Sequence, residues 1–258
     1  NGLRENKMKK WMSKFLIALL ALPVMAMANE DLALDKAPIN THDFESLQRG
    51  AKLFTNYCLN CHSAGYMRYN RLQDLGLTEQ QIKENFIFSP DTKTGDLMKV
   101  AMNPKDGKEW LGAPPPDLTV VSRSRGADWL YTYLRGFYRD SSRPTGWNNV
   151  AFDKVGMPHV LFEMQGDQVL QVEKHGEHEV KKLKLVKAGS LTRLAADGKA
   201  DTAEYDKMTA DLVNYLVYMG EPSQNKRETI GYVVVLFLTL VLLPLAYLLK
   251  KEYWKDVH

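Results

Sequence analysis

The sequence predicts a mainly α-helical exported domain with loop and hairpin insertions, followed by one carboxy-terminal transmembrane helix. Three observations support this fold class. Two amphipathic segments, at 43–58 and 208–219, bracket a proline-rich middle; short apolar stretches within 165–186 flank a turn; and an uncharged apolar segment occupies 230–249. The amphipathic segments suit the surface of one helical core, and the apolar segment is long enough to cross a bilayer.

The amino-terminal residues have the pattern of a secretory signal. Basic residues precede an apolar run at 15–25, and Ala26-Met27-Ala28 supplies the small-residue cleavage pattern. The run is too short for the roughly 20 residues that a membrane span needs. We therefore expect residues 1–28 to be a cleaved signal peptide, with Met8 as the true start and residues 1–7 upstream of it.

Two helices should form the core of the exported domain. Asp43 is a candidate N-cap for the first, whose apolar or cysteine positions recur at spacings of three or four: Phe44, Leu47, Ala51, Phe54 and Cys58. The second repeats this pattern with Met208, Leu212, Tyr215, Leu216 and Met219. Gly220 and Pro222 then supply a stop. The roughly 200 residues between signal and anchor suffice for one domain with a sizeable core.

The segment between these helices should contain a loop, a helix and a hairpin. Residues 112–118 read Gly-Ala-Pro-Pro-Pro-Asp-Leu and must be a loop, whereas 127–136 favours a helix. Farther on, Leu170 and Val172 precede His175-Gly176, and Val180, Leu183 and Leu185 follow it. This arrangement predicts a charged β-hairpin.

The most specific pattern is Cys58-Leu59-Asn60-Cys61-His62, which contains the only two cysteines of the chain. Two thiols one helical turn apart lie on the same face, so both can add to the vinyl groups of a haem. His62 can then reach the iron as its proximal ligand. This is the spacing of haem c attachment, and it predicts one covalently bound haem c.

Two other interpretations of the cysteine pair fit less well. A structural zinc site needs four ligands, but there is no second cysteine pair and the other histidines show no regular spacing with the motif. A thioredoxin-like redox pair gives no reason for His62, and it usually begins a helix, whereas the residues before Cys58 favour helix.

An electron-transfer haem also needs a second axial ligand. A methionine opposite the histidine raises the potential and blocks substrate access. The candidates outside the signal are Met67, Met98, Met102, Met157, Met164, Met208 and Met219. Most methionines are core filler; two of these lie on an apolar helix stripe, and Met67 is too near His62 to reach the opposite face easily. Met157 is favoured because a glycine and a proline flank it and can fix its loop, but spacing alone leaves the choice open.

The apolar segment from Ile230 to Leu249 predicts a transmembrane helix. Basic residues lie on both sides, so the positive-inside rule is nearly undecided, but an exported amino terminus places the tail in the cytoplasm. Pro244 lies in the last turns, where the lost backbone hydrogen bond must be met by a neighbouring helix or by local adjustment. We expect an exported domain at 29–225, an anchor at 226–249 and a tail at 250–258.

The charges argue against nucleic acid as a partner. The whole chain carries +3, but the signal and the flanks of the anchor account for about +6, which leaves the exported domain near −3. No basic patch interleaved with aromatic residues is present. Carboxylates gather at Asp201, Glu204, Asp206 and Asp211. We hypothesise that they steer a basic partner.

Several motifs together resemble a known family. They are Arg49-Gly50-Ala51, the run from Tyr57 to Ser63, Tyr69-Asn70-Arg71-Leu72, the run from Ala113 to Leu118, Arg123 and Arg125, and Gly156-Met157-Pro158. With the signal and the single span, these segments look like cytochrome c1, the haem c subunit of ubiquinol:cytochrome c reductase (respiratory complex III). Gly220-Glu221-Pro222 and residues 250–255 look like the proteobacterial members. The resemblance covers nearly the entire mature chain and implies a cytochrome c-like haem domain.

The resemblance also implies roles for individual residues. Met157 matches the axial ligand opposite His62, and Arg125 matches the arginine that pairs with a haem propionate, a suitable partner for a bidentate guanidinium. Pro115 and Pro116 match the stretch that lines the haem pocket. The region 165–200 matches no motif of the family, so its role is open.

The function that the resemblance implies is electron transfer from the Rieske iron–sulfur protein to cytochrome c. The chain would be a redox subunit without a complete active site, assembled with cytochrome b in a dimeric complex of the bacterial inner membrane, with its haem domain in the periplasm. One alternative is a membrane-anchored cytochrome c of an oxidase, which would not be expected to combine the Ala-Pro-Pro and Gly-Met-Pro segments. The other is a peroxidase-type haem enzyme, against which a methionine ligand argues.

Overall fold

The computed structural model describes residues 33–100, 102–175 and 178–255. The expected signal peptide at 1–28 lies outside them. The elements of the first half are α2 (Phe44–Leu53), η1 (Phe54–Cys58), β1 (Ala64–Arg68), η2 (Tyr69–Leu75), α3 (Glu79–Phe86), β2 (Leu97–Met98), α4 (Pro104–Leu111), α5 (Val121–Arg125) and α6 (Ala127–Arg135). Those of the second half are β3 (Phe137–Arg139), β4 (Trp147–Asn149), α7 (Phe162–Gln165), β5 (Gly166–His175), β6 (His178–Ala188), β7 (Arg193–Leu194), β8 (Ala200–Asp201), α8 (Ala203–Gly220), α9 (Gln224–Phe237), η3 (Leu238–Leu242) and α10 (Leu243–Tyr253).

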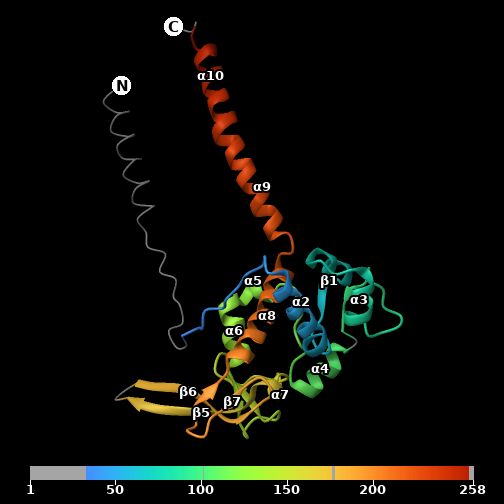
Figure 1. Ribbon diagram of the computed structural model, residues 1–258, viewed down its shortest axis with the longest axis vertical. Coiled ribbons are helices and arrows are strands. Elements are labelled where there is room, and N and C mark those ends of the chain that lie inside the picture. Colours follow the sequence, from blue (N-terminus) through green and yellow to red (C-terminus); the bar gives the residue numbers. More distant parts are fainter. Residues whose placement is uncertain (1–32, 101, 176–177, 256–258) are drawn as a thin grey trace. The chain divides into compact units, whose positions relative to one another are not determined.

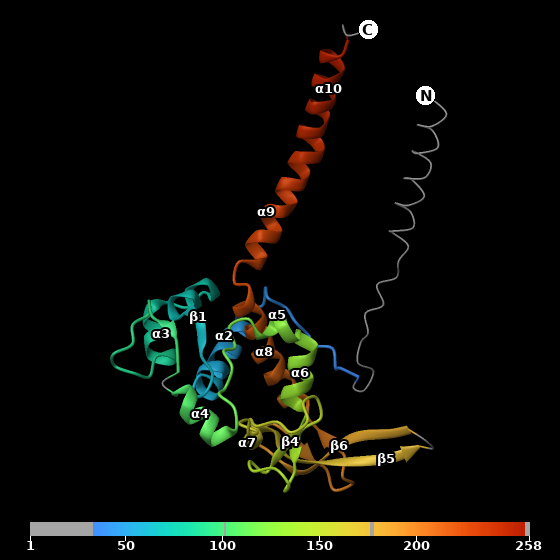
Figure 2. The same cartoon turned by 180° about the vertical axis from the view of Figure 1, so that it is seen from behind.

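Helices α2 and α8 form the centre of the fold and lie side by side in both views (Figures 1 and 2). Asp43 caps α2 as predicted, because its side chain accepts a hydrogen bond from the backbone N–H of Ser46. The two helices approach closely at Gly50, where a Cβ would overlap the backbone oxygen of Asp211. Beside this contact, Arg49 donates to both carboxylate oxygens of Asp211, at 2.6 and 3.1 Å.

The main core gathers around this helix pair. Its fully buried members include Leu47, Phe54, Leu72, Ile82 and Tyr215, so α2, η1, η2, α3 and α8 all contribute. A second, smaller cluster consists of Phe137, Trp147 and Val155, with Tyr133 and Met157 packed against it. The predicted helix at 127–136 is confirmed as α6, and the predicted loop at 112–118 contains no helix or strand.

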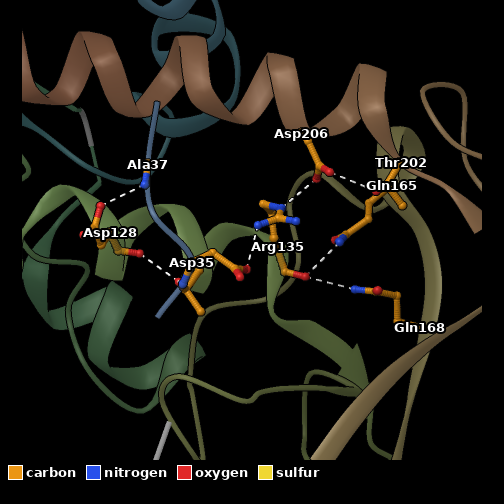
Figure 3. Close-up of polar contacts among 9 residues, drawn as sticks. Asp35, Ala37, Asp128, Arg135, Gln165, Gln168, Thr202 and Asp206 are labelled. Carbon is orange, nitrogen blue, oxygen red and sulfur yellow. Dashed lines mark hydrogen bonds and ion pairs between the residues drawn. The ribbon is translucent and has the colours of Figure 1, made fainter. Parts of the chain in front are cut away.

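Arg135 at the end of α6 joins three parts of the chain (Figure 3). Its guanidinium donates to Asp206 of α8 at 2.6 Å and to Asp35 of the amino-terminal segment at 2.7 Å. Its backbone oxygen accepts from Gln165 and Gln168 at 2.9 and 3.0 Å. One residue therefore fixes the amino-terminal segment, α6, α8 and the base of the hairpin relative to one another.

The predicted β-hairpin is confirmed. Strands β5 and β6 pair antiparallel over ten positions, from Gly166 opposite Ala188 to His175 opposite His178, with a register shift after Asp167. The other sheets of the described residues are two-stranded and short: β1–β2, β3–β4 and β7–β8. The mainly α-helical prediction with hairpin insertions therefore agrees with the structure.

The carboxy-terminal apolar segment lies in one continuous helical run, Gln224–Tyr253, which contains an 18-residue stretch with a mean hydropathy of 2.6. By length and composition it can cross a membrane. Its middle widens into the π-helical segment η3, directly before Pro244 at the start of α10. Proline has no N–H and its ring clashes with the carbonyl four residues earlier, and a π-turn is one way to accommodate it. The helix thus uses the local adjustment that the sequence required.

Candidate haem-binding site

The cysteine motif lies where the central helix ends. The π-helical turn η1 closes at Cys58, and the backbone N–H groups of Cys61 and His62 both donate to the oxygen of Cys58, at 3.0 and 2.8 Å. Cys58 is buried and Cys61 half-buried, and both are free thiols. The motif is therefore a compact turn attached to the rigid α2–α8 centre.

Burial distinguishes this pair from a redox-active dithiol. Desolvation, with a smaller contribution from Cys61, raises the pKa of the Cys58 thiol to about 12. The attacking cysteine of a redox pair instead has a lowered pKa. Among the described residues, no group of three or more His, Cys, Asp or Glu side chains could hold a metal ion. The structure thus gives no support to a closed zinc site built from the residues it describes.

The ring of His62 has a defined tautomer. Its Nδ1 atom lies 2.8 Å from the backbone oxygen of Pro116. A carbonyl oxygen can only accept, so Nδ1 carries the proton and Nε2 keeps its lone pair. Burial of the ring also lowers the pKa of His62 despite this hydrogen bond, which favours the neutral form that a metal binds. Metal-binding histidines in proteins commonly donate their other N–H to such a carbonyl.

The proline-rich loop is fastened beside the motif by further hydrogen bonds. Leu118 N–H donates to the oxygen of Ser63 at 2.8 Å, and Gly65 N–H donates to the carboxylate of Asp117 at 2.6 Å. Pro115 is half-buried against α4, where a Cβ on Gly107 would lie 2.9 Å from its Cδ. Pro116 has an exposed ring, and its contribution to the site is its backbone oxygen.

Met157 lies in the loop between β4 and α7, as expected. The side chain is half-buried against the cluster of Phe137, Trp147 and Val155. The hydroxyl of Tyr133 donates to its sulfur at 3.3 Å. The sulfur therefore lies within reach of a polar group from α6.

The other candidate methionines are mostly part of the main core. Met67, Met98 and Met219 are at most 2% exposed, and Met164 and Met208 pack against the same core. Met102 is half-buried near Pro115: a Cβ on Gly107 would lie 3.2 Å from its sulfur and 2.9 Å from the proline. Met102 therefore remains the main alternative to Met157 by location.

Arg125 is exposed in the last turn of α5, and its guanidinium lies 5.1 Å from the ring centroid of Trp129. It makes no ion pair with the residues that the structure describes. Arg123, by contrast, donates to Glu221 at 2.7 Å. Of the two arginines in this motif, only Arg125 has a charge that is not already neutralised by a described carboxylate.

Part of the acidic cluster that we hypothesised to steer a partner is not free surface. Asp211 is buried on Arg49, Asp206 pairs with Arg135, and Glu204 lies 3.3 Å from Arg193. Asp211 and Asp206 are used within the fold, whereas Asp201 and Glu204 are exposed. The steering hypothesis is therefore wrong for Asp211, because a buried and paired group contributes little to a surface field.

The arrangement fits a covalently held haem. Two thiols separated by one turn lie beside a neutral histidine whose Nε2 keeps its lone pair, and this donor set matches haem c attachment with a proximal histidine. No side chain needs to change protonation to make the histidine a ligand.

Comparisons with known proteins agree with this chemistry. The "Cytochrome C1 family" matches residues 34–257. The chain belongs to the cytochrome c1 family. Haem c is the single covalently bound cofactor of this family and hence of this chain, and the family members are membrane-anchored redox subunits of a quinol:cytochrome c oxidoreductase.

Individual relatives carry two different names. The chain is 49% identical to "Cytochrome c1" of Allochromatium vinosum, over 96% of this chain and 100% of that protein. It is 51% identical to "Ammonia monooxygenase gamma subunit" of Nitrosomonas europaea, over 96% of this chain and 99% of that protein. "Cytochrome c1" of Rhodospirillum rubrum is 29% identical over 93% of this chain and 94% of that protein.

The sequence did not reveal two participants in the site. The backbone oxygen of Pro116 has no sequence signal, because every residue has one. Tyr133 was visible only as one of three aromatic residues spaced by four in the predicted helix 127–136 and the residue after it: Trp129, Tyr133 and Phe137. Nothing in that spacing indicates a contact with Met157, 24 residues later.

Proposed function

We propose that the chain carries single electrons from the Rieske iron–sulfur protein to cytochrome c as the haem subunit of ubiquinol:cytochrome c reductase. The observation that supports this most strongly is the His62–Pro116 hydrogen bond at 2.8 Å, which leaves Nε2 of His62 as a ligand next to two free thiols. Family membership over residues 34–257 supports the same role.

The residues of the chain hold and tune the cofactor. Cys58 and Cys61 provide the thioether attachment, and His62 provides the proximal nitrogen ligand. Met157 would supply a thioether ligand to the iron, and such a ligand favours the reduced state. When bound, haem c supplies a centre that gains and loses one electron; no bond to a substrate forms in this chain.

Arg125 and the proline loop have supporting roles. The Arg125 guanidinium, which has no described carboxylate partner, binds a haem propionate and neutralises its charge. Pro115 lines the pocket, and Pro116 orients His62 through its backbone oxygen. Quinol oxidation belongs to cytochrome b, so this chain is a redox subunit of a dimeric translocase complex rather than a complete enzyme.

The topology follows from the expected cleavage after Ala28. Residues 29–225 form the periplasmic domain, residues 226–249 the anchor in the inner membrane, and residues 250–258 the cytoplasmic tail. The helical run Gln224–Tyr253 supports the anchor. Reporter fusions test the orientation: alkaline phosphatase should be inactive and green fluorescent protein fluorescent when fused after residue 258. The opposite pattern would contradict it.

Purification of the tagged full chain from its native membranes tests the function. We expect cytochrome b and an iron–sulfur protein to co-purify with quinol-dependent cytochrome c reduction. Recovery with ammonia monooxygenase subunits would instead support the role that the name of the Nitrosomonas relative indicates. Recovery with oxidase subunits would support the oxidase alternative. Rapid binding of cyanide or peroxide, without a methionine-to-iron charge-transfer band, would support a peroxidase-type enzyme.

A further inference from the structure

Tyr133 and Met157 form a contact that neither the fold nor haem attachment requires. The Tyr133 hydroxyl lies 3.3 Å from the Met157 sulfur. Within the described residues, no other hydrogen bond reaches this sulfur. The only comparable contact described is the hydroxyl of Tyr215 with the sulfur of Met98, at 3.8 Å inside the main core. Tyr133 therefore contacts the one methionine that we propose as an iron ligand.

The ring of Tyr133 packs between Trp129 of α6 and Phe137 of β3. Trp129 stacks on it with a centroid distance of 4.8 Å and an interplanar angle of 12°. Phe137 meets it edge-on at 5.1 Å. Trp129 and Tyr133 are spaced by four and so lie on one face of α6, and Phe137 follows at the start of β3. The backbone oxygen of Tyr133 also accepts from Asn149 at 2.7 Å, which ties α6 to β4.

The stacked rings of Trp129 and Tyr133 also connect the two parts of the proposed haem site. The guanidinium of Arg125 lies over Trp129 at 5.1 Å, Trp129 stacks on Tyr133, and Tyr133 donates to Met157. The proposed propionate partner and the proposed axial ligand are thus joined by two aromatic rings on adjacent turns. A tyrosine hydroxyl is protonated near neutral pH, so Tyr133 can act as the donor.

We propose that Tyr133 is a positioning residue for the second axial ligand: its hydroxyl donates to the Met157 sulfur, orients the thioether and raises the haem potential. This inference rests on the proposed function, in which Met157 binds the iron. A thioether sulfur has two lone pairs, so one can bind the metal while the other accepts the hydrogen bond. The hydrogen bond withdraws electron density from the sulfur, which weakens the ferric state more than the ferrous state.

The size of the effect follows from the strength of the hydrogen bond. A neutral hydrogen bond makes only a modest net contribution, and only the difference between its strengths in the two oxidation states changes the potential. We expect removal of the hydroxyl to change the ratio of reduced to oxidised haem by about threefold at a fixed ambient potential. At 59 mV per tenfold for one electron, this corresponds to a potential lower by about 30 mV.

The test uses Tyr133→Phe in the assembled complex, because phenylalanine retains the stacking on Trp129 and the edge contact with Phe137. We expect covalent haem and the methionine charge-transfer band to persist, with a lower potential in a spectroelectrochemical titration. The matched control Tyr215→Phe removes a hydroxyl from the Met98 contact and should leave the potential unchanged. An unchanged potential in Tyr133→Phe would overturn the inference.

A second variant guards against misfolding. Tyr133→Leu also lacks the donor and must lower the potential in the same direction; a rise in both variants would contradict the proposed role of Tyr133. The wild-type spectrum separates this inference from the proposed function. If the wild-type protein lacks a methionine charge-transfer band, the ligand role of Met157 fails and this inference fails with it. If the band is present but Tyr133→Phe has no effect, only the inference fails.

Discussion

Nδ1 of His62 lies 2.8 Å from the backbone oxygen of Pro116, a residue 54 positions later in the chain. This relationship links the attachment motif to the proline loop and decides which nitrogen of the ring faces away from the protein backbone. Because the acceptor is a backbone atom, its function survives changes of the Pro116 side chain that preserve the loop.

His62→Ala should abolish quinol-dependent cytochrome c reduction, because it removes the proposed proximal ligand while leaving both thiols. Pro116→Ala is the matched control, since it keeps the carbonyl acceptor and loosens the loop by only about 1 kcal/mol. Steady-state turnover of purified complexes measures both. Normal turnover by His62→Ala would remove His62 from the iron.

Met157→Leu should keep covalent haem but lose the methionine charge-transfer band, with a strong fall in potential. Redox titration of the haem measures the potential. Met102→Leu and Met164→Leu are the comparison variants, and both should titrate like the wild type. If one of them, rather than Met157→Leu, lowers the potential, that residue is the ligand.

Gly50→Ala should destabilise the fold by about 3 kcal/mol or more, because the new methyl group meets backbone at a helix crossing that cannot open cheaply. A Cβ there would lie 2.7 Å from Cβ of Tyr215. Gly95→Ala is the control, since no atom lies within 4 Å of its Cβ position. Thermal unfolding in detergent should separate the two variants, and equal midpoints would contradict the close approach.

Arg135→Ala should lower the free energy of unfolding by about 1–3 kcal/mol. The substitution breaks charge-assisted hydrogen bonds to Asp206 and Asp35, made by a side chain that is only 24% exposed. Arg193→Ala removes an ion pair whose arginine is 77% exposed, and exposed pairs contribute little. Denaturant unfolding compares the two variants. A loss of unfolding free energy as small as that of Arg193→Ala would show that Arg135 does not hold the amino-terminal segment and α8 together.

The segment before the anchor should loosen in acid. Hydrogen bonds from Arg227 and Arg123 lower the pKa of Glu221 below its ordinary value of 4.5. A lowered pKa in the folded state means that the stabilisation is complete above 4.5 and is lost as the pH falls through the lowered value. Hydrogen exchange of residues 221–227, corrected for intrinsic rates, should therefore accelerate below pH 4.5.

Glu221→Gln should show the faster exchange already at neutral pH, because it lacks the charge that the two arginines bind. Glu45→Gln is the control, since Glu45 is 89% exposed and lies 3.9 Å from Arg49. Slow exchange in Glu221→Gln at pH 7 would contradict the role of this carboxylate.

Capping, periodicity and hydropathy patterns in the sequence predicted the elements that form from residues close together in the chain. The Asp43 cap, the helix at 127–136, the hairpin and the apolar helix each have a signal within a few residues, and each is present in the structure. The π-helical turns η1 and η3 were not predicted in form. Their geometry depends on how the chain continues after Cys58 and before Pro244, rather than on composition.

Contacts between distant residues limited the prediction of the site. The motif at Cys58, Cys61 and His62 was visible because its chemistry requires adjacent residues. The partners Pro116 and Tyr133 were not visible, since a backbone acceptor has no side-chain signature and an aromatic residue on a helix usually packs in the core. The acidic residues of α8 were misjudged for the same reason: Arg49 and Arg135, which pair with Asp211 and Asp206, lie far away in sequence.

The two clusters of the core give the proposed ligands unequal mechanical support. His62 follows the end of η1, whose residues Phe54 and Cys58 belong to the main core, whereas Met157 belongs to a loop that packs on three buried side chains, Phe137, Trp147 and Val155. The histidine side therefore rests on the large main core and the methionine side on the smaller cluster. A substitution that loosens the smaller cluster should therefore disturb the proposed Met157 ligand and leave the attachment at Cys58 and Cys61 intact.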